Sequence, residues 1–390
     1  MRNKQKPEEI EYAAVLGGGG TKGAYQVGAW KAIKELGIKV NCIVGVSIGA
    51  LNGAMFIQDE IEKSEELYNK IKITDVMDID ETVNAEKGIF NIANITKLTK
   101  EFAEQKGISN EPLRKTIEKY IDIDKIYKSK IDFGLLALDA NERTPVEMYK
   151  KDIPKEQFVD YLLASSCFPI FKPQKIGDKE FLDGGLYDNM PINMLLKKNY
   201  KNILVFDIAG IGIKRKLLNK DVYLKVISPN ESLGGTFEFN PEKIKSNIKL
   251  GYLDTLKVFN KVQGHIYYFN VKEFNKMMEN YGLQTIYGLE HAAQIYNIDK
   301  LKIYKFEEFI EELRIKHVEA QTRYNKIKEI LKSKNILEIK SQIKTIFDGD
   351  LGICFATDIY LDKPMSKKFE HLNHFTRDYT KCVKALLELT

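Results

Sequence analysis

A serine between two glycines has the surroundings that most clearly indicate chemistry. Ser47 lies in Gly45-Val46-Ser47-Ile48-Gly49, after a short apolar run over residues 42–46 and before helix-forming residues over 50–58. Strand, G-x-S-x-G and helix in this order predict a nucleophile elbow, where a sharp turn exposes the serine hydroxyl. A serine in this place also fits a simple helix N-cap. Because a serine hydroxyl is a poor nucleophile until a base and an oxyanion site hold it, the rest of the chain must supply both.

A glycine turn earlier in the chain is the candidate oxyanion site. Gly18, Gly19 and Gly20 follow an apolar strand over residues 10–16 and precede a helical pattern over 22–36. The run from Gly18 to Gly23 matches G-x-G-x-x-G, but the second strand holds no acid for a ribose, and Lys22 is not followed by the Ser or Thr of a P-loop. The remaining functional interpretation is that the backbone N–H groups of the three glycines face a developing oxyanion.

The candidate bases are a histidine and an aspartate. His265 follows an aspartate in the order Ser, Asp, His, but it lies in no recognisable motif. Asp183 is the stronger candidate, because the glycines of Asp183-Gly184-Gly185 allow a tight turn after a short strand and direct the carboxylate inward. Partial burial beside an apolar acyl pocket would raise its pKa by roughly 1 to 3 units and make it a better base. An ordinary turn aspartate is the alternative.

Alternating strands and helices must position these groups. The alternation predicts a mainly parallel sheet with right-handed crossovers, so that residues 17–20 and Ser47 share its carboxyl edge, where ligands bind. Residues 74–110 are polar and weakly periodic, which fits a cap over the site or a plain surface insertion. A long amphipathic helix is predicted over residues 242–262. Further buried strands are predicted over residues 131–139, 202–208 and 222–227, with 146–149 pairing beside the first.

The C-terminal part of the chain, after about residue 269, reads as charged helices. Residues 304–323 place apolar side chains on one stripe with glutamates beside it, which argues against contact with anionic lipid. Residues 326–347 intersperse apolar side chains with six lysines. Such a stretch fits a helix lying on a membrane surface, or a packed helix whose lysines are in water.

Composition limits the function classes. With 60 basic and 55 acidic residues in 390, the net charge of +5 is too small to indicate nucleic acid. The four cysteines are far apart and form no C-x-x-C, which suits reduced thiols and predicts no zinc site. The first residues contain no apolar signal region, and no run reaches the 18 apolar residues of a membrane span. These features predict a cytoplasmic protein and leave peripheral membrane contact open.

The three motifs together resemble the patatin-like phospholipase family, in which a glycine-rich turn, a G-x-S-x-G elbow and D-G-G/A occur in this order. The motif glycines here are Gly18, Gly19, Gly20, Gly23, Gly45, Gly49, Gly184 and Gly185. The segments Ala24-Tyr25-Gln26, Ala50-Leu51-Asn52 and Asn189-Met190-Pro191 add to the likeness, as do residues 164–173. The resemblance covers residues 12–207.

The resemblance implies a three-layer α/β sandwich with a mainly parallel central sheet, formed by residues 11–268, and leaves 269–390 as a helix-rich extension of unknown role. It implies a Ser47–Asp183 dyad without histidine, an oxyanion hole at residues 18–20, and hydrolysis of lipid acyl esters without a cofactor. Lys22 would add positive potential, or is a solvated lysine at a helix start. The alternatives are a lipid-binding scaffold with a vestigial site, acyl transfer to another acceptor, and a nucleotide-binding oxidoreductase. The oligomeric state stays open.

Overall fold

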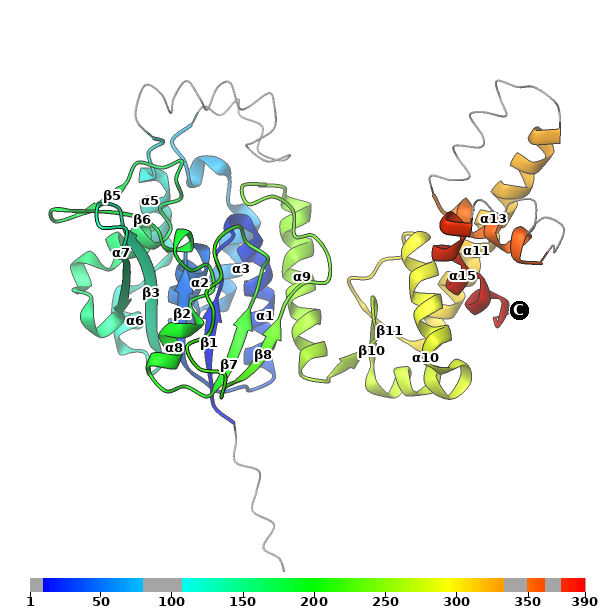
Figure 1. The fold of residues 1–390 in the computed structure, drawn as a ribbon, viewed down its shortest axis with the longest axis horizontal. Helices are drawn as coiled ribbons and strands as arrows, with labels where there is room; N and C mark the ends of the chain where they lie inside the picture. The colour runs from blue at the N-terminus through cyan, green and yellow to red at the C-terminus, as the bar shows by residue number, and fades with distance from the viewer. Residues whose placement is uncertain (1–9, 80–106, 333–348, 362–372, 390) are drawn as a thin grey trace, which may run out of the picture. The chain divides into compact units, whose positions relative to one another are not determined.

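The computed structural model describes residues 10–79, 107–332, 349–361 and 373–389 (Figure 1). The chain divides into two compact units, Met1–Val258 and Phe259–Thr390. The sequence predicts the boundary after residue 268, whereas the small sheet that begins at Val262 already belongs to the second unit.

The first unit is built on a sheet that contains eight of the described strands, with the order β5-β6-β3-β2-β1-β7-β8 and β4 paired to β3. Five neighbouring strands, β3, β2, β1, β7 and β8, run parallel, and β4, β5 and β6 form antiparallel pairs at one side. The predicted mainly parallel sheet is therefore confirmed. The strands are β1 Tyr12–Leu16, β2 Val40–Val46, β3 Asp132–Asp139, β4 Pro145–Tyr149, β5 Gln174–Ile176, β6 Lys179–Asp183, β7 Asn202–Phe206 and β8 Tyr223–Ile227.

Helices cover both faces of this sheet. On one face, Met194 and Leu195 of α8 pack on side chains from β1, β2 and β7. On the other face, α2 lies against Ile43 and Phe133. Helix α1 packs closely on α9 (Figure 1). The α-helices of this unit are α1 Ala24–Glu35, α2 Ile48–Ile57, α3 Ile61–Lys70, α5 Glu111–Tyr120, α6 Ile123–Lys128, α7 Phe158–Ser165, α8 Ile192–Lys197 and α9 Pro241–Val258. Short 3-10 turns are η1 Gly20–Gly23, η2 Ile73–Asp75, η3 Lys150–Asp152, η4 Lys155–Gln157 and η5 Gly184–Leu186.

The sheet brings two of the predicted motifs to one edge. Strands β1 and β2 are parallel neighbours with Leu16 opposite Gly45, so the glycine turn and Ser47 follow at the same end. Strand β6 ends at Asp183 and pairs with β3 through Ala137. Parallel strands therefore place the glycine turn beside the serine, and the antiparallel β6 delivers the aspartate to the same edge.

Some local predictions need correction. Strand β8 is predicted as a buried core strand, but it is the edge strand, and Tyr223 and Val226 are exposed. The helix predicted over residues 242–262 ends at Val258, because residues 262–263 form β9. Of the predicted insertion over 74–110, residues 80–106 lie outside the described residues.

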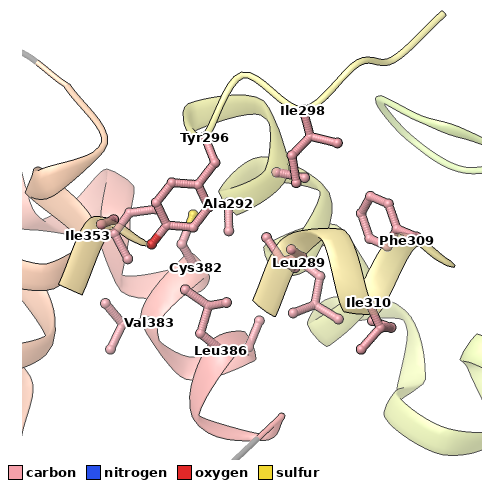
Figure 2. Close-up of a cluster of buried hydrophobic side chains, with 14 of the residues drawn as sticks. Leu289, Ala292, Tyr296, Ile298, Phe309, Ile310, Ile353, Cys382, Val383 and Leu386 are labelled. Carbon is pink, nitrogen blue, oxygen red and sulfur yellow. The ribbon is translucent and has the colours of Figure 1, made fainter. Parts of the chain in front are cut away.

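The second unit is helical around an aromatic core. Its elements are β9 Val262–Gln263, β10 Tyr268–Asn270, α10 Val271–Ile295, β11 Ile303–Tyr304, α11 Phe306–Lys332, α13 Leu351–Leu361 and α15 Asn373–Leu387. Figure 2 shows side chains from the four described helices of this unit meeting in the core, among them Tyr296, Phe309, Ile353 and Leu386. The apolar stripe predicted over residues 304–323 is buried here. Of the lysine-rich stretch, residues 333–348 lie outside the described residues.

Candidate active site

Ser47 occupies a sharp, strained turn between β2 and α2. Its φ of 56° and ψ of −130° lie outside the regions that non-glycine residues ordinarily adopt, as a nucleophile elbow requires. The Ser47 N–H donates to the Ser165 carbonyl and to its Oγ, each at 3.1 Å. Ser165 Oγ donates in turn to the Leu136 carbonyl at 2.7 Å, so the turn is tied to β3. The strain at Ser47 is held by this network, and its side chain remains half-buried at the sheet edge.

The motif glycines are needed because their surroundings are too close for a side chain. A Cβ at Gly49 would lie 2.2 Å from the Leu16 carbonyl oxygen, and one at Gly45 would lie 2.3 Å from the Gly49 oxygen. The elbow therefore packs directly on the end of β1. A Cβ would come within 3.0 Å of another atom at every one of the motif glycines, Gly18, Gly19, Gly20, Gly23, Gly45, Gly49, Gly184 and Gly185.

Asp183 meets Ser47 although the two residues are far apart in the chain. It is 3% exposed at the end of β6, and its carboxylate accepts a hydrogen bond from the Ser47 hydroxyl. The Gly185 N–H also donates to Asp183 Oδ1, at 2.7 Å. Burial raises the pKa of Asp183 from its ordinary 3.8 to about 6, against the lowering effect of these two hydrogen bonds. A carboxylate with such a pKa is ionised at neutral pH and is a stronger base than a solvated aspartate.

The glycine turn lies directly beside Ser47. A Cβ on Gly18 would be 3.0 Å from the Ser47 Cβ, and Gly19 and Gly20 line the same cavity as Ser47. Within the described residues, the N–H groups of Gly18 and Gly19 have no hydrogen-bond acceptor. Unpaired amides beside a serine are the arrangement that can stabilise a carbonyl oxygen as it gains charge.

Several polar side chains that the sequence analysis gave no role hold this turn. Gln26 Nε2 donates to the Gly17 carbonyl at 2.8 Å, and Asn52 Nδ2 donates to Gln26 Oε1 at 2.8 Å. The Tyr68 hydroxyl donates to Asn52 Oδ1 at 3.1 Å, and Asn189 Nδ2 donates to the Gly18 carbonyl at 3.3 Å. Gln26 and Asn52 are buried polar residues on helix stretches whose neighbouring residues are apolar, and this is the signal that could have identified them.

An apolar cavity of about 240 Å³ opens beside these groups. Ser47 and Asp183 line it together with α2, α3, α5 and segments around residues 168 and 237. Among the side chains in its wall are Leu51, Met55, Leu67, Ile117, Phe168 and Phe237. Small-molecule sites are commonly about 300–1,000 Å³, so this cavity suits one narrow apolar group better than a whole lipid.

The other two candidate side chains lie elsewhere. The Lys22 ammonium donates to the Ala209 carbonyl at 3.1 Å, and Lys22 is not among the residues that line the cavity. Burial lowers its pKa. His265 belongs to the second unit, where its ring lies against Tyr287 and His291. In the described part of the chain, no three His, Cys, Asp or Glu side chains are grouped to hold a metal ion.

Comparison with known proteins agrees with the motifs and their arrangement. The family model described as patatin-like phospholipase matches residues 14–196, which include the glycine turn, Ser47 and Asp183. These residues, slightly less than half of the chain, form a patatin-like phospholipase domain. Patatin-like phospholipase domain-containing protein 7 from Rattus norvegicus is 28% identical over 202 residues, 51% of this chain and 14% of that protein.

Two other relatives match a shorter segment with a higher sequence identity. Lysophospholipase nte1 from Aspergillus terreus is 56% identical over 45 residues, and neuropathy target esterase sws from Drosophila sechellia is 58% identical over 45. Each match covers 12% of this chain and 3% of the relative, so the chain corresponds to a small part of these curated proteins.

Among solved structures, VipD from Legionella pneumophila is similar with a TM-score of 0.42 and 15% identity, over 98% of this chain and 90% of that one. The type III effector protein ExoU is similar with a TM-score of 0.34 and 11% identity, over 97% and 78% of the two chains.

Proposed function

We propose that the patatin-like domain is a lipid acyl hydrolase that works through an acyl-serine intermediate. The observation that carries the proposal is the hydrogen bond between Ser47 and a buried Asp183 whose pKa is about 6, at the edge of an apolar cavity. The patatin-like phospholipase domain and the similarity to a lysophospholipase and an esterase support a lipid ester as the substrate.

In the first half of the reaction, Asp183 accepts the Ser47 proton while Ser47 Oγ bonds to the ester carbonyl carbon. The N–H groups of Gly18, Gly19 and Gly20 donate to the carbonyl oxygen as it becomes an oxyanion. The carbon–oxygen bond to the alcohol then breaks, and the proton on Asp183 passes to the departing alkoxide. The products of this half are a free alcohol and an acyl-Ser47 ester.

In the second half, water replaces the alcohol. Asp183 takes a proton from the water as its oxygen attacks the acyl carbon, and the same amides hold the second oxyanion. The bond to Ser47 Oγ breaks, the proton returns to Ser47, and a fatty acid leaves. The apolar wall formed by Leu51, Met55 and Ile117 holds the acyl chain in both halves.

The test is hydrolysis of a short-chain p-nitrophenyl ester and of a phospholipid and lysophospholipid panel, beside labelling with a fluorophosphonate probe. Wild-type chain should hydrolyse the ester and be labelled at Ser47, because only an activated serine reacts with the probe. Ser47→Ala should lose both while keeping its melting temperature. Ser129→Ala, which changes a serine at the end of α6 outside the cavity lining, should keep both.

Each alternative predicts a different result. A lipid-binding scaffold would bind lipid without being labelled, and hydrolysis that survives in Ser47→Ala would remove the proposal. Acyl transfer would give an acylated acceptor instead of free fatty acid, which product analysis detects. A nucleotide-binding oxidoreductase would show a rise in melting temperature with NAD or FAD.

A further inference from the structure

The loop that follows β7 carries an unusual set of exposed side chains. Residues 209–220 read Ala-Gly-Ile-Gly-Ile-Lys-Arg-Lys-Leu-Leu-Asn-Lys, with four basic residues and no acidic one. Ile211 is 77% exposed, Ile213 53% and Leu218 67%. Single exposed aliphatic side chains are ordinary, but three within eight residues beside four basic ones form a patch that needs a partner.

The backbone of this loop is fixed, even though its side chains are exposed. The Ile213 carbonyl accepts from the Asn189 N–H at 2.5 Å, and the Leu218 N–H donates to Asn193 Oδ1 at 2.9 Å. At its start, a Cβ on Gly210 would lie 1.8 Å from the Gly18 carbonyl oxygen, so the loop packs on the glycine turn. The aliphatic side chains are therefore presented by a backbone that is bound to the site.

The loop also borders the cavity. Ile211 and Gly212 line the same cavity as Ser47, and so does Leu186, which is 39% exposed. A side chain that lines a cavity and is also 77% exposed lies at its mouth. Anything that contacts the loop from outside is therefore next to the entrance for substrate.

Two of the basic side chains are available for an external partner. Lys214 pairs with Asp207 at 2.5 Å, and the Arg215 guanidinium lies over the Tyr187 ring at 3.7 Å. Lys216 and Lys220 have no acidic partner within the described residues. Unpaired ammonium groups beside exposed aliphatic side chains match the surface of an anionic bilayer, where charged phosphates cover an apolar interior.

We propose that residues 209–220 form a membrane-docking loop that seats the mouth of the cavity on an anionic lipid bilayer. Ile213 and Leu218 enter the interfacial region, while Lys216 and Lys220 contact lipid phosphates. The inference rests on the proposed function, since a cavity that holds one acyl chain leaves the rest of a lipid outside, in the bilayer. A bilayer fits better than a protein partner because the loop adjoins an apolar entrance and carries only positive charge.

The test measures vesicle binding without catalysis. Full-length Ser47→Ala chain is sedimented with vesicles of phosphatidylcholine mixed with phosphatidylserine, and with vesicles of phosphatidylcholine alone. Adding Ile213→Ser and Leu218→Ser should reduce the partition coefficient on the mixed vesicles at least about tenfold. The matched control is Ile315→Ser with Val318→Ser on α11, which removes two aliphatic side chains of similar exposure, 49% and 58%, and should leave binding within about twofold.

The charge component has its own variants. Lys216→Gln and Lys220→Gln should each reduce binding to the mixed vesicles about fivefold and should change binding to phosphatidylcholine little. Because all four changed side chains are exposed, melting temperatures should stay close to that of the parent chain.

The proposal is overturned if the parent chain does not bind the mixed vesicles, if both aliphatic pairs reduce binding equally, or if the lysine variants bind like the parent. These outcomes are independent of the proposed function, because binding is measured with Ser47 replaced. Ester hydrolysis by the wild-type chain in solution, without vesicles, tests that function separately.

Discussion

Each compact unit buries carboxylates, and Asp183 in the first unit is held very differently from Glu290 in the second. Asp183 in the first unit accepts one backbone N–H, from Gly185, and the Ser47 hydroxyl. Glu290 in the second unit is fully buried and accepts from three successive backbone N–H groups, those of His265, Ile266 and Tyr267. Both carboxylates are buried, and they differ in how many backbone amides donate to them.

The difference has a chemical consequence. Amide hydrogen bonds stabilise the charged form of a carboxylate, so a buried acid with few of them has a raised pKa and a stronger affinity for protons. Asp183, with a pKa of about 6, can accept a proton from Ser47. Glu290 instead closes the turn before β10 onto α10, where its amide partners leave it a structural acceptor.

The largest expected effect is on catalysis by Asp183→Asn. This variant keeps the shape of the side chain but removes the proton acceptor, so kcat/KM for a soluble ester should fall about a thousandfold or more. Retention of more than a tenth of the activity would show that Asp183 is not the base.

The Asp183→Asn variant should have a higher free energy of unfolding than wild type. A loss of activity in this variant then reflects the missing proton acceptor, and not unfolding. Because burial raises the pKa of Asp183 from 3.8 to about 6, its ionised form destabilises the folded state. That cost is fully present above about pH 6 and disappears as the pH falls towards 4. At pH 8 the free energy of unfolding of Asp183→Asn should exceed that of wild type by at most about 3 kcal/mol, measured by urea unfolding.

A pair of glycine substitutions sharpens the comparison between the units. At Gly49 a Cβ would meet the Leu16 carbonyl at 2.2 Å, whereas at Gly282 in α10 nothing lies within 4 Å. Gly49→Ala should displace the elbow and lower kcat/KM by about a hundredfold. Gly282→Ala meets only the backbone strain of φ 73° and ψ 163°, a region almost restricted to glycine, which costs about 1–3 kcal/mol in unfolding free energy, and it should leave ester hydrolysis unchanged.

Replacing Glu290 by glutamine should give the opposite pattern to Asp183→Asn. Glu290→Gln replaces one of the two acceptor oxygens by an amide donor beside three backbone N–H groups. The unfolding free energy of the second unit should fall by about 1–3 kcal/mol, seen as an earlier loss of hydrogen-exchange protection in α10. Ester hydrolysis should stay within about twofold of wild type; a large loss would give the second unit a catalytic role.

The sequence predicted the parts of the site that depend on local backbone geometry. Ser47 and the glycines around it form a turn that few residue types can adopt. The elbow could therefore be predicted from the sequence. The turn after β6 was readable for the same reason, and the alternating strands predicted that the glycine turn and Ser47 share one edge.

The remaining features depend on contacts between distant segments. The cavity wall combines α3, α5 and residues near 237. No local sequence pattern predicts that these segments surround Ser47. The exposure of Ile211 likewise follows from packing. The apolar residues of β8 predict a core strand, but its place at the sheet edge is set by the order of the strands. The helical pattern after residue 269 could be predicted from the sequence. The boundary between the two compact units, after residue 258, could not.

In the proposed mechanism a carboxylate, and no histidine, activates Ser47. The most direct test is the pH dependence of kcat/KM for a soluble ester, in wild type and in His265→Ala. Both should show an acid limb that halves the activity near pH 6 and falls about tenfold per pH unit below it, since Asp183 must be ionised to accept the proton. His265→Ala should keep most of the activity and the same limb. A limb that vanishes in His265→Ala, or a loss of several orders of magnitude, would contradict the account and restore a histidine triad.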